Sequence, residues 1–297
     1  MSILVTGVTG FVGRYVLQQL RQKYQEDKLL VLSSGKIKGV KNIASNNYEF
    51  DNEYLLNNGC QDVEIIIHIG AWTPKSGKDV DKIKETTSNI VNTQRLLMSN
   101  FPALKKVIYC STLDIYNNTQ DIISEDTITI PKSMYAWSKL YCEKLLITLA
   151  KEKNIIYEIL RLGHVYGEGE EKYQKVLPTM IRKAIKGENL IIYGDGEAIR
   201  TFIYIDDVAK AIIKSIDLET SNVINVVGKE PITVNQLAKM IISNCDNSVQ
   251  IEYVPTAEKN KDYLFDNRRM EKYLLNKFTP FEVGLQREIQ YMKEYIL

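Results

Sequence analysis

Short apolar runs alternate with amphipathic segments through the first half of the chain. The run 3–5 has the length of a buried strand, and the apolar residues between positions 11 and 20 recur at the spacing of one helix face. Further short runs rich in β-forming residues follow, mostly separated by helical patterns, at 29–32, 48–50, 65–69, 107–110 and 155–160. Strands that alternate with helices in this way predict an α/β fold with a doubly wound parallel sheet.

The pattern changes after Gly167. A polar loop is followed by a helical pattern over 176–185, a turn at 193–196, and a capping box of Thr233 and Gln236. This half is expected to form a smaller C-terminal lobe over the open end of the sheet. Because ligands of such sheets bind beyond the carboxyl ends of the strands, we expect the substrate between the two halves.

A glycine motif joins the first predicted strand to the first predicted helix, with Gly7, Gly10 and Gly13 at regular spacing. The first glycine permits a tight turn, the second lets backbone N–H groups approach a pyrophosphate, and the third lets the helix pack closely on the strand. Phosphate is then expected at the positive helix N-terminus, beside Phe11 and Val12. An ordinary turn is the alternative, but the preceding buried strand and the following amphipathic helix favour a dinucleotide site.

Composition and charge argue against several classes of protein. The 297 residues are 44% hydrophobic and 25% charged, as in ordinary globular proteins, and 38 basic residues nearly balance 37 acidic ones. We therefore expect neither a nucleic-acid nor a membrane partner. The four cysteines are far apart and only two histidines are present, so no metal site is expected. The first strand follows Met1 directly, without a signal pattern, which favours a cytoplasmic location.

A tyrosine and a lysine four residues apart, Tyr135 and Lys139, occupy the first turns of a predicted helix. Residues at this spacing share a helix face. A phenol has a pKa of about 10, and a neighbouring ammonium group favours the phenolate, so the pair is suited to proton transfer. Such a pair is often no more than an edge aromatic and a solvated charge. The glycine motif earlier in the chain favours the catalytic interpretation.

Together these stretches resemble the extended short-chain dehydrogenase/reductase superfamily, the NAD(P)-dependent nucleotide-sugar epimerases, dehydratases and reductases. The resemblance covers nearly the whole chain and implies an NAD(P)-binding Rossmann domain over 1–166, to which 201–216 returns, a nucleotide-sugar-binding lobe over 167–297, and a homodimer. The stretches that carry it are TGVTGFVG (6–13), Asp51 after the third predicted strand, HIGA (68–71), NIVNT (89–93), CSTLDIY (110–116), YAWSK (135–139), LRLGHVYG (160–167), RTFIYIDDVAKA (200–211) and the segment 225–238.

The resemblance implies catalytic roles for three residues. Thr112 stands where the family places a Ser or Thr whose hydroxyl bonds the substrate oxygen, although it could also be an ordinary hydroxyl at a strand end. Tyr135 would be the general acid/base. Lys139 would lower the pKa of Tyr135 and bond the nicotinamide ribose, and Asn89 would support the cofactor side of this network. Because hydride transfer to or from a carbinol carbon requires a matching proton transfer, these groups suit the chemistry.

The resemblance also implies binding residues. Asp51 would accept a hydrogen bond from the adenine amino group, and the backbone of Gly70–Ala71 would line the cofactor. Arg200 would neutralise the substrate diphosphate. Thr73, in the variable loop 72–76, is expected to contact the sugar. Tyr193 would stack on the nucleotide base, or else serve as an aromatic residue of a lid.

The chain departs from the family pattern at two places. The Asn of the family's R-x-x-N-x-x-G motif is His164 here, so a substrate-binding position is kept but one diphosphate contact changes. The 4,6-dehydratases of the family carry Asp-Glu after Ser-Thr, where this chain has Leu113 and Asp114. Leucine cannot protonate a leaving hydroxyl, which argues against a dehydratase.

The end of the second predicted strand bears on cofactor choice. An acid there would bond both ribose hydroxyls and repel a 2′-phosphate, but the chain has Ser33 and, nearby, Lys36 and Lys38. This composition favours NADP, with NAD as the alternative.

Three functions are compatible with these residues. The first is an oxidoreductase that reduces a nucleotide-linked 4-keto sugar with external NADPH. The second is a 4-epimerase that oxidises and re-reduces one carbon with a retained NAD. The third is a non-catalytic dinucleotide-binding module, against which the intact Thr112, Tyr135 and Lys139 argue. The nucleotide base and the sugar are left open.

Overall fold

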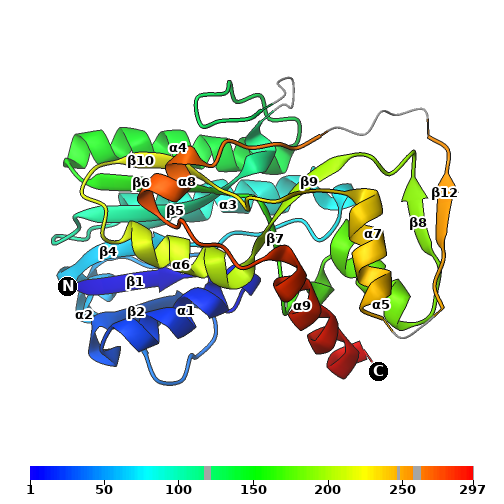
Figure 1. The fold of residues 1–297 in the computed structure, drawn as a ribbon. Coiled ribbons are helices and arrows are strands. Elements are labelled where there is room, and N and C mark those ends of the chain that lie inside the picture. Colours follow the sequence, from blue (N-terminus) through cyan, green and yellow to red (C-terminus); the bar gives the residue numbers. More distant parts are fainter. Residues whose placement is uncertain (117–121, 246–247, 257–261, 297) are drawn as a thin grey trace.

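The main sheet is parallel and has helices on both faces. The computed structural model describes residues 1–116, 122–245, 248–256 and 262–296. Within these ranges the sheet has seven strands in the order β10-β6-β5-β4-β1-β2-β3 (Figure 1). They are β1 (Ser2–Thr6), β2 (Leu29–Ser33), β3 (Lys41–Ala44), β4 (Val63–His68), β5 (Lys106–Thr112), β6 (Ile156–Leu162) and β10 (Asn222–Val226). The predicted doubly wound parallel sheet is confirmed.

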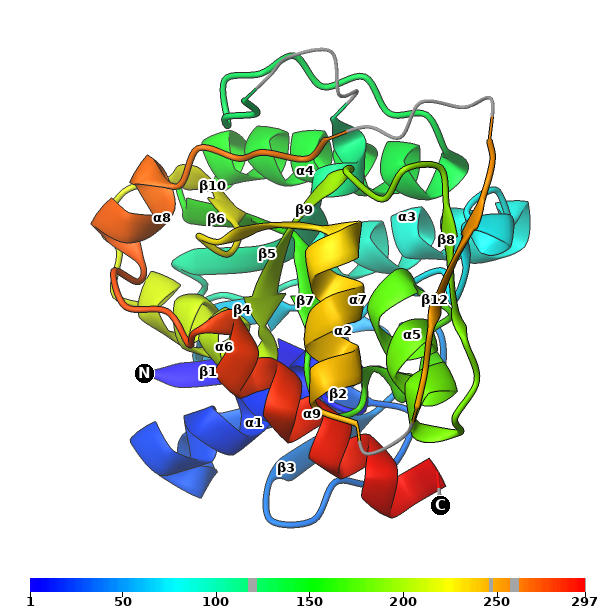
Figure 2. The same cartoon turned by 45° about the vertical axis from the view of Figure 1, so that its right-hand side comes forward.

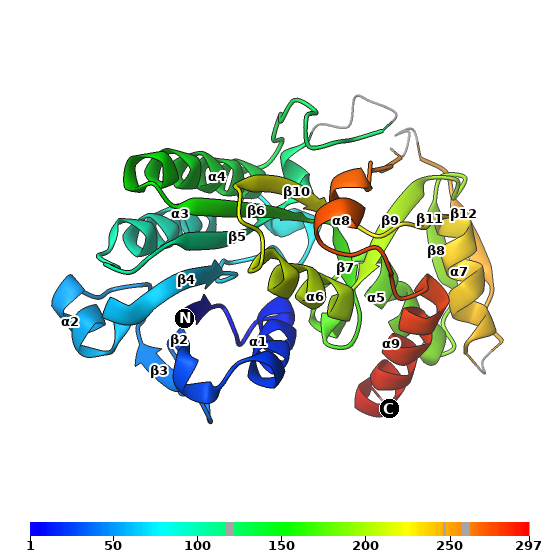
Figure 3. The same ribbon diagram turned by 60° about the vertical axis from the view of Figure 1, so that its left-hand side comes forward.

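Two hydrophobic cores lie on opposite faces of this sheet. Successive side chains of a strand point to opposite faces, so Ile3 and Val5 join one core and Leu4 joins the other. Helices α1 and α6 pack together over the first core, and α3 and α4 over the second (Figure 3). The helices of this domain are α1 (Phe11–Lys23), α2 (Asn52–Asn57), α3 (Ile83–Met98), α4 (Met134–Lys153) and α6 (Ile205–Ser215).

The strand order reverses at β1. The chain first builds outward through β2 and β3, and then continues on the other side of β1 through β4, β5 and β6. The glycine motif follows β1, which places it at this reversal, between β1 and β4. Ligands of doubly wound sheets bind at such a point, beyond the carboxyl ends of the strands.

The third strand differs from the prediction. It runs over Lys41–Ala44 rather than 48–50, and pairs with β2. Asn47 and Tyr48 have positive φ angles of 53° and 56°, a left-handed conformation outside the extended region that regular strands occupy. Tyr48 and Phe50 instead pack against the second core, which explains why the segment is aromatic.

The C-terminal part forms a smaller unit beside the sheet (Figure 2). Among the described residues it contains a three-stranded sheet, β11-β9-β7, and a two-stranded one, β12-β8. The predicted capping box of Thr233 and Gln236 is confirmed at the start of α7. Its elements are β7 (His164–Tyr166), α5 (Val176–Ile185), β8 (Leu190–Tyr193), β9 (Ile199–Tyr204), β11 (Pro231–Thr233), α7 (Val234–Ser243), β12 (Ile251–Val254) and α9 (Phe281–Ile296). Helix α8 (Arg268–Tyr273) packs instead against β10 of the main sheet.

Short 3-10 helices occupy several loops of both parts. They are η1 (Glu26–Lys28), η2 (Cys60–Asp62), η3 (Gly77–Asp79), η4 (Leu113–Ile115) and η5 (Glu170–Lys172). In the part of the chain that the structure describes, no helix has both the length and the apolar character needed to cross a bilayer. Nor do three His, Cys, Asp or Glu side chains of those residues gather where they could hold a metal ion.

Candidate active site

The glycine motif forms a tightly packed turn. Gly7 has a φ of +75°, and a Cβ there would lie 2.5 Å from the backbone nitrogen of Gly70. A Cβ on Gly13 would lie 2.0 Å from the Gly7 carbonyl oxygen. Side chains at these two positions would therefore push β1, α1 and the loop after β4 apart.

The N-terminus of α1 fits an anionic ligand. Gly10 is its N-cap residue, and no described side chain caps the helix. The first N–H groups of a helix lack partners within it and carry a positive partial charge. Phe11 is buried against Tyr173, and Val12 is half-buried in the first turn. A pyrophosphate at this helix end would accept hydrogen bonds from the N–H groups that no side chain caps.

The residues expected to contact the ribose and the adenine of the cofactor have different surroundings in the structure. Ser33 ends β2, and its hydroxyl accepts a hydrogen bond from the Gly35 N–H at 3.2 Å, while Lys36 is exposed. Asp51 is the N-cap residue of α2, where its Oδ1 accepts from the Tyr54 N–H at 2.7 Å. This cap accounts for an aspartate at that position without a ligand, so its contact with adenine stays a prediction.

Tyr48 is a residue near the cofactor loop that sequence reasoning missed. A Cβ on Gly70 would lie 2.3 Å from its hydroxyl oxygen, so the phenol occupies the space that a side chain there would need. Its ring lies 5.8 Å from the ring of His68. Burial raises the pKa of Tyr48 to about 12, although a hydrogen bond with Thr6 acts to lower it. The left-handed backbone at Tyr48 makes this placement possible, and no sequence pattern signals it.

Asn89 positions the loop that follows Gly70–Ala71. It is 3% exposed on α3, its Oδ1 accepts from the Trp72 N–H at 2.7 Å, and its Nδ2 donates to the Trp72 carbonyl at 2.9 Å. Both halves of the amide are used, so Asn89 fixes the backbone of this loop, and its part in cofactor binding stays a prediction. The Gly70 N–H donates to the Thr6 hydroxyl at 3.0 Å, which joins the same loop to β1.

The hydroxyl of Tyr135 lies in a small group of polar side chains. Tyr135 is 7% exposed in the first turn of α4, where Ser133 caps the helix. Burial is the largest cause that raises the pKa of Tyr135, the Asp114 carboxylate raises it further, and hydrogen bonds with Thr73 and Thr112 lower it. The charge of Lys139 is not among the main causes of this shift, so the expected lowering by Lys139 is not what sets the pKa of Tyr135. The phenol is therefore protonated at neutral pH and able to donate.

Thr112 and Asp114 complete this group. Thr112 is the last residue of β5, and its hydroxyl lies 3.1 Å from Asp114 Oδ2, to which it donates. Burial raises the pKa of the Asp114 carboxyl, although the hydrogen bond from the Thr112 hydroxyl and the charge of Lys175 act to lower it. Sequence reasoning identified Asp114 only as a departure from the dehydratases. Its carboxylate in fact contacts the same hydroxyl as Tyr135.

Lys139 lies one turn after Tyr135, in the interior. It is 3% exposed, its Nζ donates to the Cys110 carbonyl at 2.6 Å, and it lies 4.4 Å from the centre of the Tyr109 ring. Burial lowers the pKa of Lys139. Burial and, second, the Lys139 ammonium lower the pKa of His68 to about 3, so His68 is neutral. The lysine thus fixes α4 against the end of β5.

A buried ion pair fixes α4 one turn further on. Arg161 on β6 donates to both carboxylate oxygens of Glu143, at 3.1 and 2.8 Å, and the two side chains are 6% and 1% exposed. The Arg161 guanidinium also donates to the Tyr116 hydroxyl, which donates to Asn225 Oδ1 at 2.9 Å. Helix α4, β6 and β10 are therefore connected beneath Tyr135.

The expected diphosphate residues lie on two neighbouring strands of the C-terminal lobe. His164 begins β7, which pairs with β9, where Arg200 lies two residues before the partner of His164. The Arg200 guanidinium carbon lies 5.1 Å from the centre of the Tyr263 ring, and the His164 ring lies 5.7 Å from it. Tyr193 ends β8, in a different sheet, and is 63% exposed.

Lys175 is a second residue that sequence reasoning missed. It precedes α5, and its Nζ lies 3.3 Å from Glu170 Oε1. Its charge lowers the pKa values of both Asp114 and His164, so it lies between the Tyr135 group and the residues expected to bind the diphosphate. A lysine at the end of a polar loop offers no sequence signal for this role.

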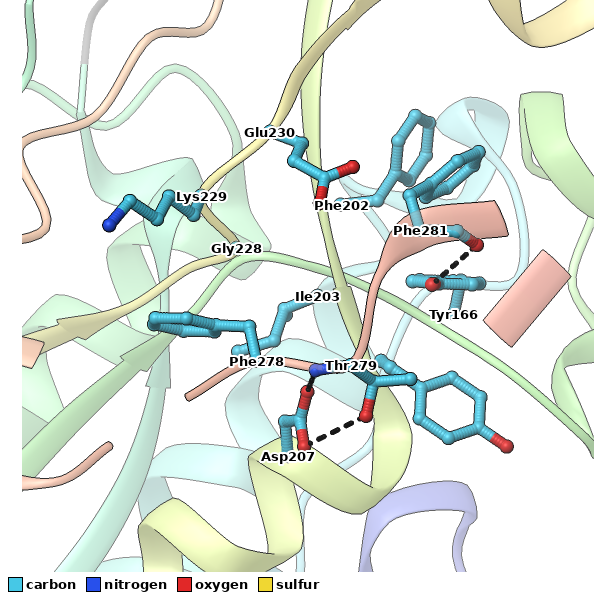
Figure 4. A pocket seen from close by; sticks show the side chains of 11 residues that line it. Tyr166, Phe202, Ile203, Asp207, Gly228, Lys229, Glu230, Phe278, Thr279 and Phe281 are labelled. Carbon is cyan, nitrogen blue, oxygen red and sulfur yellow. Dashed lines mark hydrogen bonds between the residues drawn. The ribbon is translucent and has the colours of Figure 1, made fainter. Parts of the chain in front are cut away.

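A separate pocket lies where β9, α6 and the start of α9 meet (Figure 4). Asp207 Oδ2 accepts from the Thr279 N–H at 2.6 Å, and Oδ1 accepts from the Thr279 hydroxyl at 3.1 Å. The Tyr166 hydroxyl donates to the Phe281 carbonyl at 3.2 Å. Among the described residues, its lining includes none of the candidate site residues, so we assign it a structural role.

Comparisons with known proteins agree with this arrangement. The sequence model of the NAD dependent epimerase/dehydratase family matches residues 3–228. The chain is 26% identical to the trifunctional UDP-glucose 4,6-dehydratase, 3,5-epimerase and reductase of Arabidopsis thaliana over 98% of its own length, but spans only 46% of that protein. It is also 26% identical to the UDP-N-acetyl-alpha-D-glucosaminuronate decarboxylase of Bacillus cytotoxicus, with 98% of the chain and 97% of the relative covered.

A solved structure shows the same fold over the whole chain. The UDP-glucuronic acid 4-epimerase of Bacillus cereus, in complex with UDP-glucuronic acid and NAD, superposes with a TM-score of 0.82 at 25% identity, covering 99% of this chain and 100% of the other. That protein binds a dinucleotide and a nucleotide sugar together.

Proposed function

The chain belongs to the NAD-dependent epimerase/dehydratase family, and we propose that it transfers hydride between a nicotinamide cofactor and a nucleotide-activated sugar, with Tyr135 as the general acid/base. The observation that carries the proposal is the meeting of Tyr135 with the Thr112 and Thr73 hydroxyls at the carboxyl end of β5, beside the loops that fit a dinucleotide. Hydride transfer to a sugar carbonyl requires a proton donor and a second hydrogen-bonding hydroxyl at the same sugar oxygen, and this group contains both.

Each residue has a defined part in this reaction. The bound nicotinamide supplies or accepts the hydride. Tyr135, protonated because burial raises its pKa, donates its proton to the sugar oxygen in the direction of reduction. Thr112 would orient that oxygen by donating its single hydroxyl hydrogen to it, in place of the 3.1 Å hydrogen bond that it donates to Asp114 Oδ2 in the structure. Lys139 holds the helix that carries Tyr135 through its bond to the Cys110 carbonyl, and its remaining donors would bond the nicotinamide ribose.

We propose net reduction of a 4-keto sugar as the reaction, with 4-epimerisation as the second candidate. The residues at the end of β2, which lack an acid, favour an exchangeable NADP and therefore reduction. The Bacillus cereus relative is a 4-epimerase with NAD, which favours the second. Incubation with UDP-sugars and their 4-keto forms separates them, because reduction consumes one equivalent of NADPH per product and epimerisation consumes none.

The proposed NADP preference predicts the effect of an acid at position 33. Ser33→Asp should weaken NADP binding and favour NAD, because a carboxylate there repels the 2′-phosphate. An open pocket along α1, lined by Thr9, Arg14 and Arg21 and by Ile37 from the loop after β2, supports room for the phosphate. Dissociation constants of both dinucleotides for the wild type and the variant, measured by fluorescence titration, test this. Wild-type protein that binds NAD much more tightly than NADP would contradict the preference.

We also propose that the chain forms a homodimer through the outer faces of α3 and α4. These neighbouring helices expose large apolar side chains at helical spacing, and such a patch on a folded protein marks an interface. They are Ile83 (69% exposed), Val91 (37%), Met98 (61%), Met134 (43%), Trp137 (52%) and Tyr141 (49%).

Charge at this face should separate the protomers. A Met98→Glu, Tyr141→Glu double variant is expected to be monomeric in light scattering, because burying two carboxylates in an apolar interface is unfavourable. The matched control is Tyr295→Glu on α9, away from this face, which is 70% exposed in the wild type and should leave the mass unchanged. A monomeric wild type would rule the interface out.

A further inference from the structure

Three basic side chains approach one another beside the Tyr135 group, and we call them the basic cluster: His164, Lys175 and Arg200. His164 and Arg200 both lie beside the Tyr263 ring, on the paired strands β7 and β9. Lys175 comes from the loop before α5 and acts electrostatically on His164. The cluster is thus assembled from three separate segments: β7, the loop before α5, and β9.

His164 has an unused nitrogen in this cluster. Its Nδ1 is buried and has no hydrogen-bond partner among the described residues. A buried polar atom without a partner carries a free-energy cost, so native structures rarely keep one unless a ligand or water completes it. A positive surrounding and an unsatisfied nitrogen together indicate an anion as the ligand.

We propose that His164 takes up a proton when the diphosphate of a nucleotide sugar binds beside Lys175 and Arg200. This inference rests on the proposed function, since it concerns the same substrate. The proton comes from solvent and forms a second N–H on the ring, so the basic cluster has two full charges when empty and three when occupied. Binding of the substrate and of this proton are then mutually reinforcing.

The chemistry of the ring explains why a proton is needed. Diphosphate oxygens accept hydrogen bonds and cannot donate them once ionised. Neutral imidazole has one donor and one acceptor nitrogen, whereas imidazolium has two donors. The asparagine that the family pattern has at this position always presents a donor amide. In His164 the hydrogen bond with the Thr201 backbone uses the other ring nitrogen, because Nδ1 has no partner. Nδ1 of the neutral ring therefore presents a lone pair and becomes a donor only after protonation.

The charges around His164 favour the neutral ring while the cluster is empty. Burial, Lys175 and Arg200, in that order, lower the pKa of His164 to about 4, and only the Thr201 backbone acts in the opposite direction. Three carboxylates face the cations rather than the ring: Glu170 pairs with Lys175, Asp114 lies near Lys175, and Asp262 lies near Arg200. A diphosphate with two negative charges would reverse the sign of the local potential and raise the pKa of the ring.

The sign of the resulting pH dependence follows from these two states. Below about pH 4 the ring is already protonated in the empty protein. Between that value and the pKa of the ring in the complex, each binding event requires a proton, so affinity falls by up to about tenfold per pH unit as pH rises. Above the pKa of the complex the dependence on this residue disappears.

The chain offers an internal control for observing the proton directly. It contains two histidines, and His68 is 1% exposed, with its ring nitrogens 2.7 and 2.9 Å from the Thr6 and Thr93 hydroxyls. In the full chain, loaded with dinucleotide and labelled with ¹⁵N-histidine, UDP-glucose at pH 6 should convert the His164 ring signals from the neutral to the imidazolium pattern. The His68 signals should stay neutral, and His164→Asn assigns the two rings.

Calorimetry provides the second measurement. UDP-glucose is a suitable probe because neither of its phosphates titrates near pH 6. Titrations in two buffers of different ionisation enthalpy should show about one proton more taken up by wild type than by His164→Asn. The comparison matters because Glu170, whose pKa burial raises to about 7, can also titrate on binding and is present in both proteins.

The outcomes separate this inference from the proposed function. Binding of UDP-glucose with equal proton uptake by wild type and His164→Asn, and a neutral His164 spectrum, would overturn the proton linkage and leave the proposed function intact. Failure of UDP-glucose and other nucleotide sugars to bind at all would overturn both. Protonation of His164 on binding, absent in the variant, supports the inference.

Discussion

Replacing Tyr135 by phenylalanine should lower kcat and kcat/KM by about 10²–10⁴-fold, the usual contribution of general acid–base catalysis. The change keeps the ring, its packing against Trp72 and the start of α4, and removes only the hydroxyl that hydrogen-bonds with Thr73 and Thr112. Tyr135 is the phenol of this group, and burial keeps it protonated and able to donate. A small residual rate should persist from positioning of the reactants.

The measurement needs a matched tyrosine on the same helix. Tyr141 is 49% exposed on α4, so Tyr141→Phe removes an identical hydroxyl without touching the site. That variant should turn over at the wild-type rate, and both variants should bind dinucleotide and unfold as the wild type does. Thr112→Val should act like Tyr135→Phe but more mildly, because water can partly replace a hydroxyl that orients the oxygen. Full activity of a folded Tyr135→Phe protein on its true substrate would refute the assignment.

Breaking the buried pair of Glu143 and Arg161 should cost about 3–5 kcal/mol of unfolding free energy. Replacing Arg161 by methionine leaves the Glu143 carboxylate buried without its two charged hydrogen bonds, and removes the donor that the Tyr116 hydroxyl accepts from. The penalty comes from stranding a charge in a low-dielectric interior rather than from the attraction alone. Urea unfolding of Arg161→Met against wild type measures it.

Two comparisons make this stability prediction specific. Lys23 and Asp217 form an ion pair at 3.4 Å whose side chains are 43% and 45% exposed, so Lys23→Met should change stability by no more than about 1 kcal/mol. The double variant Glu143→Leu, Arg161→Met should lose less than the sum of the two single losses, because neither charge is then left alone. A loss below about 1 kcal/mol for Arg161→Met would show that the pair is dispensable.

The sequence by itself determined the features that depend on local spacing. The glycine spacing indicates a turn followed by a helix start at Gly7, Gly10 and Gly13. Gly70 and the Gly7 carbonyl can approach this closely only because the glycines lack a Cβ. The alternation of strands and helices determined the parallel sheet, and the combination of motifs determined the family. Tyr135 and Lys139 were identifiable because helical geometry fixes the relation of residues four apart.

Only the tertiary structure decided which distant groups meet these residues. Thr73 and Asp114 reach the Tyr135 group, and Lys175 joins His164, through contacts between segments whose separation in the chain gives no periodic signal. The third strand was misplaced because Tyr48 is apolar and β-forming, yet its backbone is left-handed. The direction of the Tyr135 pKa also needed the fold, since burial raises it more than the hydrogen bonds with Thr73 and Thr112 lower it, and burial is a property of the packed molecule rather than of any stretch of sequence.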